Sequence, residues 1–174
     1  MAISVNLLKE SGFDEAMLGI SLSFNAPVEN MPARAEKLAM KGMGHSKFLE
    51  SMMVWIDVRA PRYFWQEADT YRISSKQSQA TMHTLTKKPL CQGDFAGGVP
   101  DQWIEDLNAK ILAGDLFGAK RLLPESFLQR RIWCMSYKTL QNIVQQRKNH
   151  RLEEWREFCQ EILKQVEHPS FLDQ

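Results

Sequence analysis

Cysteine is scarce in this 174-residue chain, and no stretch stays apolar for long. Cys91, Cys134 and Cys159 are far apart and form no CxxC pair, which argues against a disulfide framework and for free thiols buried as small apolar groups. No window approaches the ~18 apolar residues of a membrane span, so we expect no membrane association. Acids and a lysine interrupt the opening MAISVNLLKESGFDEAMLGI, which is not typical of a signal peptide, and we expect a cytoplasmic protein.

The short motifs of common active sites are also missing. The chain has no Walker loop, no GxGxxG and no GxSxG. Its four histidines show neither HxH nor HxxxH spacing, so we expect no metal site. The formal net charge is +1, which gives no reason to expect DNA or RNA as a partner. Any anion must therefore be held by a local cluster of side chains.

What the sequence does contain fits a single globular domain, residues 1–174. Hydrophobic residues make up 44% and charged residues 25% of the chain. Apolar runs predict strands at 3–8, 52–58 and 126–136, and the polar break at Asp57 indicates one less buried face. Helical patterns cover 11–24, 33–52 with a break at Gly42 and Gly44, 61–69, 100–116, 118–124, and 139–166 with a break near 149. This order of elements is typical of an α/β or α+β protein.

One predicted helix has a clear apolar face. In PDQWIEDLNAKILAGDL, residues 100–116, helical spacing groups five apolar side chains: Trp103, Ile104, Leu107, Ile111 and Leu112. We expect this face to be buried.

Three segments combine basic residues with hydroxyl or amide groups. They are DTYRISSKQSQATMH at 69–83, AKRLLPESFLQRR at 119–131 and QQRKNHR at 145–151. Several donors converging beside a positive charge bind phosphate, so a nucleotide-sized anion is a candidate ligand. Each segment also has an ordinary interpretation, as a polar loop, a sheet edge or a helix C-terminus that favours cations. The residues alone specify no reaction.

Two stretches resemble the flavin-dependent thymidylate synthases. GHSKFLESMMVWIDVRAP, residues 44–61, is similar to the family's Gly-His, Glu-His, apolar strand and basic-Ala-Pro pattern, with Ser51 in place of the second histidine. AKRLLPESFLQRRIWCMSYKTLQNIVQQR, residues 119–147, aligns without a gap. Lys120 stands in for an arginine implicated in nucleotide phosphate binding, and Lys138 stands in for another arginine. Asn142 and Arg147 match outright, and the family's counterpart of Arg147 contacts the pyrimidine.

The family's signature, R-H-R-x-x-S-x-N-E-x-S-x-R-Y, falls on residues 70–83 in the same register. Only Arg72 and Ser75 match it. Thr70 and Met82 replace two arginines, and losing two charge-assisted contacts of roughly 1.5–3 kcal/mol each could weaken binding about a hundredfold or more. The segment also resembles a divergent branch found in bacteriophage genomes, where DTY…STMH takes the signature's place.

The resemblance implies an α/β fold, with a mixed sheet flanked by helices, that assembles as a homotetramer with ligand sites between subunits. FAD is a possible cofactor. The implied nucleotide-binding residues are Arg72, Ser75, His83, Lys120, Asn142 and Arg147, and the implied cofactor-binding residues are His45, Ser51 and Lys138. We expect Arg72, Ser75 and His83 to point into one ligand cleft lined by residues 69–83.

Three classes of function remain open. The chain could transfer a one-carbon (methyl) group, with flavin, to a pyrimidine deoxynucleotide such as deoxyuridylate. It could keep the nucleotide pocket without the chemistry, as a sensor or as a phage-encoded protein that sequesters a nucleotide signal in the host cytoplasm. It could instead be a scaffold for protein partners. The rewritten signature favours the second class.

Overall fold

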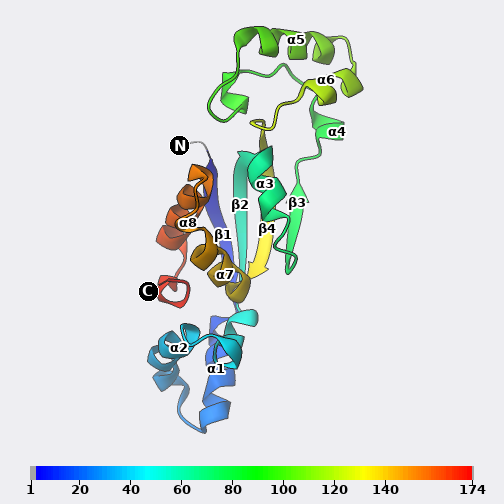
Figure 1. The fold of residues 1–174 in the computed structure, drawn as a ribbon. Helices are drawn as coiled ribbons and strands as arrows, with labels where there is room; N and C mark the ends of the chain where they lie inside the picture. Colours follow the sequence, from blue (N-terminus) through cyan, green and yellow to red (C-terminus); the bar gives the residue numbers. More distant parts are fainter. Residues whose placement is uncertain (1–2, 174) are drawn as a thin grey trace.

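A four-stranded sheet forms the centre of the computed structural model, which describes residues 3–173 (Figure 1). Strands β1 (Ser4–Ser11), β2 (Met53–Pro61), β3 (Ser74–Ser78) and β4 (Leu128–Ser136) lie in the order β1-β2-β4-β3. The predicted α/β class with a helix-flanked sheet is confirmed. The sheet is not mixed in strand direction, however, because each of its pairings is antiparallel.

The two faces of the sheet differ in burial. On β2, Val54, Ile56, Val58 and Ala60 are fully buried, and side chains two residues apart share a face. Their neighbours, including Trp55 and Arg59, therefore lie on the opposite face and remain partly exposed. Asp57 also lies on this second face, as its polar break in the sequence predicted. It is buried by its ion pair with Arg130 of the neighbouring strand.

Aromatic side chains pack helices onto the buried face. These helices are α3 (Arg62–Ala68), α7 (Tyr137–Arg147) and α8 (Glu153–Gln165). Phe64 of α3 packs against Trp155 of α8 with ring centroids 4.2 Å apart and the ring planes tilted by 36°. Trp65 donates its indole N–H to the carbonyl oxygens of Ala60 and Gln129, so this buried polar group is satisfied.

Smaller helical lobes lie beyond the two ends of the strands (Figure 1). The lower lobe, residues 13–50, contains α1 (Phe13–Phe24), η1 (Val28–Asn30), α2 (Met31–Ala39) and η2 (Met43–Glu50). The upper lobe, residues 81–127, contains α4 (Thr81–Thr84), η3 (Gln92–Asp94), α5 (Asp101–Leu112) and α6 (Leu116–Leu122). A last short turn, η4 (Pro169–Phe171), follows α8. The upper lobe has its own hydrophobic cluster, separate from the main core.

Several local predictions need correction. Trp103 and Leu112 of α5 are 43% and 76% exposed, because only the narrower stripe of Ile104, Leu107 and Ile111 faces the lobe's core. The cysteines also differ from one another. Cys91 is exposed and Cys134 is half-buried, whereas burial raises the pKa of the Cys159 thiol to about 12.

The strand β3 was not predicted from the sequence. Its residues, SSKQS, have little β propensity and no apolar alternation. Tertiary contacts form it instead: it pairs with β4 along its whole length, and the Lys76 ammonium lies 4.9 Å from the centroid of the Trp133 ring. No helix between residues 3 and 173 is long and apolar enough to cross a membrane.

The aromatic packing predicts a large difference between two phenylalanines. Phe64 is fully buried and Phe117 is 67% exposed. Phe64→Ala should lower the free energy of unfolding by about 3–5 kcal/mol, because it leaves a cavity among the rings. Phe117→Ala, the control, should change it by less than about 0.5 kcal/mol. Urea denaturation measures both, and equal effects would contradict the assignment of the core.

Candidate functional site

The segment 69–83 follows the edge of the sheet from α3 to the upper lobe. Arg72 lies in the turn before β3, Ser75 lies on β3 itself, and His83 lies exposed on α4. Within one chain these three side chains therefore do not meet in a single cleft. Arg72 and Ser75 line neighbouring hollows at one end of β3, and His83 lies beyond the other end (Figure 1).

The first hollow lies between the turn at residues 70–73 and the start of α7. We call it the α7 hollow; it has a volume of about 380 Å³. Arg72 and Lys138 supply two cations, and no carboxylate is among the lining residues, which are Thr70, Tyr71, Arg72, Ile73, Lys138, Thr139, Gln141, Asn142 and Gln145. The N-terminus of α7 adds a favourable dipole for an anion. The α7 hollow thus suits a phosphate or a carboxylate.

Lys138 is held in place at this hollow. Its ammonium donates to Ser46 Oγ at 2.7 Å and to Gln141 Oε1 at 3.0 Å. An ammonium has three N–H donors, so one remains for a ligand. The hydroxyl of Thr139 donates to the carbonyl oxygen of Ile73 and ties α7 to the turn that carries Arg72.

A second hollow adjoins the α7 hollow. It has a volume of about 480 Å³ and shares Ile73, Lys138 and Thr139 with it, and Ser75 forms part of its wall. Four of the predicted residues, Arg72, Ser75, Lys138 and Asn142, are therefore brought onto one continuous surface.

Arg147, at the end of α7, lies in a separate polar cluster. Its Nε donates to the Tyr71 hydroxyl at 2.8 Å, and its Nη1 donates to Glu67 Oε2 at 2.6 Å. Its guanidinium also lies 4.9 Å from the Trp155 ring centroid, and the Trp155 indole N–H donates to the same oxygen of Glu67. The charge of Arg147 is thus compensated by Glu67. Among residues 3–173, Nη2 of Arg147 has no hydrogen-bond partner.

Sequence reasoning did not identify Glu67 and Tyr71 as partners of Arg147. The helix α3 and the turn after it bring them to α7, about eighty positions away in the chain. No local pattern in the sequence indicates these partners. His150 also lies beside Arg147, with Nε2 2.8 Å from Nη1.

Lys76, another cation of segment 69–83, is also paired. Its ammonium lies 3.7 Å from an Asp69 carboxylate oxygen and donates to Ser74 Oγ. Burial lowers the pKa of Lys76, and the Asp69 carboxylate acts in the opposite direction. We therefore assign Lys76 to the sheet edge and not to the ligand surface.

Lys120 lies far from this surface. It belongs to α6 in the upper lobe, where its ammonium lies 3.3 Å from the Thr81 hydroxyl oxygen. The α7 helix lies at the opposite end of the strands (Figure 1). Within one chain, Lys120 and His83 therefore lie at the opposite end of the strands from Arg72, Asn142 and Arg147.

The remaining predicted residues, His45 and Ser51, share a hollow of about 550 Å³ in the lower lobe. Ile20, Phe24 and Phe48 give it an apolar wall, and Lys47 adds a cation. Lys138 does not line this hollow, but its hydrogen bond to Ser46 connects α7 to the segment that carries His45. Between residues 3 and 173, no group of three or more His, Cys, Asp or Glu side chains could hold a metal ion.

Comparisons with known proteins identify the fold. No protein-family model matches the chain, and no curated protein sequence is significantly similar to it. Two solved structures from Helicobacter pylori match closely in shape. Thymidylate Synthase X (ThyX) with FAD and dUMP has a TM-score of 0.79 and 19% identity, over 98% of this chain and 97% of the other. The flavin dependent thymidylate synthase ThyX complexed with FAD and dUMP has a TM-score of 0.81 and 18% identity, over 98% of each chain. The chain has the fold that the sequence resemblance implied.

The cluster around Arg147 gives a prediction for stability. Glu67→Gln removes the charge that compensates a largely buried guanidinium, whose side chain is 18% exposed. We expect the free energy of unfolding to fall by about 1–2 kcal/mol in urea denaturation. The control is Glu125→Gln, which alters the exposed pair with Arg62 and should have a clearly smaller effect. If the two variants are equally stable, the cluster does not contribute as described.

Proposed function

We propose that this protein binds a nucleotide at the boundary between subunits and no longer carries out the chemistry of the enzymes whose fold it shares. The observation that carries the proposal is the separation of Lys120 from Arg147 at opposite ends of the strands. The resemblance assigns both residues to one nucleotide. Both can contact it only if they come from different chains, which agrees with the homotetramer that we infer.

The pairing of Arg147 with Glu67 limits what this arginine can bind. A phosphate at Arg147 would lie close to the Glu67 carboxylate and be repelled by it. A neutral carbonyl oxygen, such as those of a pyrimidine, can accept from Nη2 without this penalty. We therefore assign the base to Arg147 and the phosphate to Lys120, whose ammonium has no ion-pair partner in the described part of the chain.

The α7 hollow suits a second anionic group. Arg72, Lys138 and Asn142 surround it with donors, and Ser75 adds a hydroxyl at the adjoining hollow. One nucleotide with several phosphates, or a second nucleotide, would use these donors. His83 lies on α4 in the upper lobe, as Lys120 does on α6. A site formed between two chains would therefore use all six residues assigned to the nucleotide.

Flavin-dependent one-carbon transfer to a pyrimidine deoxynucleotide is the second candidate function. It is favoured by the FAD and dUMP that both Helicobacter pylori structures contain. The residues fit FAD in part: Arg72 and Lys138 suit its phosphates, and the hollow at His45 and Ser51 has an apolar wall for a ring. When bound, a flavin supplies reducing equivalents. Two features argue against this candidate. Thr70 and Met82 lack the charge of the signature arginines that they replace. Tyr71, in the place of the signature histidine, already uses its hydroxyl in hydrogen bonds with Arg147 and Gln146.

We therefore prefer a binding protein, and its biological use would be to sense a nucleotide or nucleotide-derived signal or to sequester it. The likeness of DTYRISSKQSQATMH to a bacteriophage branch supports sequestration inside an infected host cell. Such a role needs affinity and abundance but no turnover, which is consistent with loss of the signature.

Subunit mixing tests the site directly. Lys120→Ala and Arg147→Ala should each weaken binding of dUMP by about 10- to 100-fold in calorimetry, the loss of one charge-assisted contact. The two variants are then mixed in equal amounts and allowed to exchange subunits. If each site takes Lys120 from one chain and Arg147 from another, about one quarter of the sites should contain both native residues and bind tightly. No recovery, with both variants folded and oligomeric, would contradict a site shared between chains. A panel of other nucleotides identifies the preferred ligand, and unchanged binding by Arg147→Ala would remove that residue from the site.

The absence of the family's chemistry is tested in cells. Expression in a thymidine-requiring bacterium should not permit growth without thymidine, because Thr70 and Met82 replace two of the signature's arginines and Ala80 replaces its second serine. The Helicobacter pylori enzyme is the positive control. The purified protein should also show no visible flavin absorption. Growth without thymidine would favour the one-carbon transfer reaction over the binding protein.

A further inference from the structure

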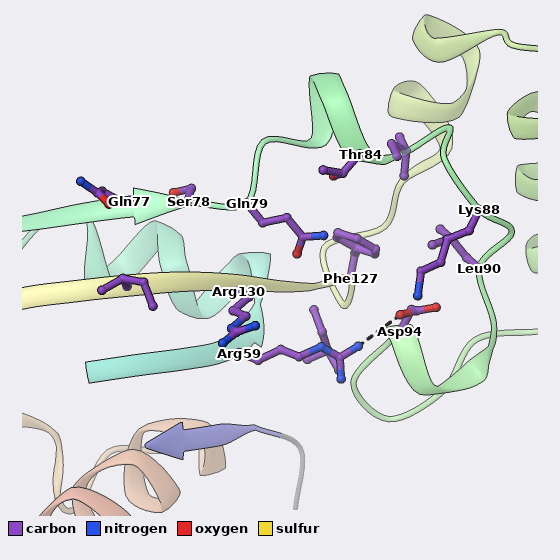
Figure 2. Close-up of a pocket in the computed structure, with 13 residues that line it drawn as sticks. Arg59, Gln77, Ser78, Gln79, Thr84, Lys88, Leu90, Asp94, Phe127 and Arg130 are labelled. Atoms are coloured by element: carbon purple, nitrogen blue, oxygen red, sulfur yellow. Dashed lines mark hydrogen bonds and ion pairs between the residues drawn. The ribbon is translucent and has the colours of Figure 1, made fainter. Parts of the chain in front are cut away.

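Ion pairs that hold arginine side chains recur on the surface of this chain. Figure 2 shows the hollow of about 780 Å³ between the less buried face of the sheet and the upper lobe, where Lys88 lines the wall and Arg59 Nη2 lies 3.2 Å from Asp94 Oδ1. The second arginine of this hollow, Arg130, pairs with Asp57. Each of these pairs joins one arginine to one carboxylate, and neither group changes its charge near neutral pH in ordinary surroundings.

The pair of Arg147 and Glu67 differs, because a histidine lies against it. Arg147 Nη1 donates to Glu67 Oε2 at 2.6 Å and lies 2.8 Å from His150 Nε2. The same imidazole nitrogen lies 3.7 Å from Glu67 Oε2. The side chains of Arg147 and His150 are only 18% and 21% exposed, so solvent screens the charges of this triad weakly.

Hydrogen-bond donors face both nitrogens of the His150 ring. Arg147 Nη1 lies at Nε2, and the backbone N–H of Leu152 lies 3.3 Å from Nδ1. A neutral imidazole has one acceptor nitrogen and can therefore satisfy one of these donors, and the shorter contact favours Arg147. A protonated imidazole has no acceptor and satisfies neither. The arrangement thus fits the neutral form of His150.

The charges around His150 come from three helices and one turn. Arg147 of α7 is a cation, and Arg156 of α8 is a second cation whose Nη1 donates to the His150 carbonyl oxygen at 2.6 Å. Glu67 of α3 is the facing carboxylate, and Tyr71 follows in the turn, where its hydroxyl accepts from Arg147 Nε. A protonated His150 would repel Arg147 and compete with it for Glu67 Oε2.

We propose that His150 is a positioning residue, which holds the Arg147 guanidinium in place for a pyrimidine and releases it on gaining a proton. The inference rests on the proposed function, in which Nη2 of Arg147 donates to a carbonyl oxygen of the base. The direction of Nη2 is set by the bonds of the other two nitrogens, from Nε to Tyr71 and from Nη1 to Glu67 and His150. Because an imidazole changes its charge near neutral pH, nucleotide binding becomes weaker in mild acid.

Calorimetry with dUMP at about pH 8 and about pH 5.5 tests this dependence. The phosphate of dUMP itself titrates near pH 6, so each variant is compared with the wild type as a ratio of its two affinities. This ratio should be about tenfold larger for the wild type than for His150→Gln, whose amide accepts a hydrogen bond without titrating. His150→Lys fixes a cation and should bind weakly at both pH values. His168→Gln, the control, changes a ring that stacks on Phe13 and should keep the wild-type ratio.

A second readout needs no ligand. The Trp155 indole N–H donates to Glu67 Oε2 at 2.9 Å, the oxygen for which a protonated His150 would compete. The chain has five tryptophans, and labelling them with nitrogen-15 gives one indole N–H signal for each in NMR. The signal that Glu67→Gln shifts most identifies Trp155. It should move between about pH 8 and about pH 5.5 in the wild type and stay fixed in His150→Gln.

The two measurements separate this inference from the proposed function. Absence of dUMP binding at either pH, together with a Trp155 signal that responds, would contradict the proposed function and support the pH-dependent contact of His150 with Arg147. Equal affinity ratios in the wild type and His150→Gln would overturn the inference, as would a Trp155 signal that stays fixed in the wild type. Thermal melting at both pH values checks that every variant is folded.

Discussion

The antiparallel pair of β2 and β4 is the interaction on which the rest of this structure depends. It runs without a shift from Met53 opposite Ser136 to Pro61 opposite Leu128. Because side chains alternate along both strands, one face becomes a continuous apolar surface with Val54, Ile56 and Trp133 fully buried. The helices α3, α7 and α8 fill that face with aromatic rings. Hollows suited to ligands consequently lie elsewhere, at the strand ends, on the less buried face and in the lower lobe.

Ion pairing then decides which cations remain available. Arg147 is paired with Glu67, Arg130 with Asp57 and Arg131 with Asp69. The basic segments that stand out in the sequence are therefore in large part structural, as their ordinary interpretation suggested. In the part of the chain that the structure describes, Arg72, Lys88 and Lys138 have no ion-pair partner, and each lines a hollow. Function is better assigned from these unpaired cations than from the density of positive charge along the chain.

The sequence predicted those elements whose own residues determine them. The strands around MMVWIDV and RRIWCMS, and the helix from Asp101, follow from apolar periodicity. It did not predict β3, because SSKQS forms a strand only beside β4 and Trp133. The candidate site shows the same division. The fold brings Arg72, Lys138 and Asn142 to one hollow, although the resemblance assigns Lys138 to the cofactor and the other two to the nucleotide. The partners of Arg147 depend on how α3 and α7 pack, which no local pattern encodes.

The central claim is that the nucleotide site is completed only when chains associate. Sedimentation velocity tests this claim most directly. The absorbance of the nucleotide is followed separately from that of the protein. The protein is diluted through the concentration range in which the chains associate. The account predicts that nucleotide absorbance sediments only with species larger than one chain of 20.1 kDa and is released as the assembly dissociates. Nucleotide that sediments with the 20.1 kDa monomer would contradict it.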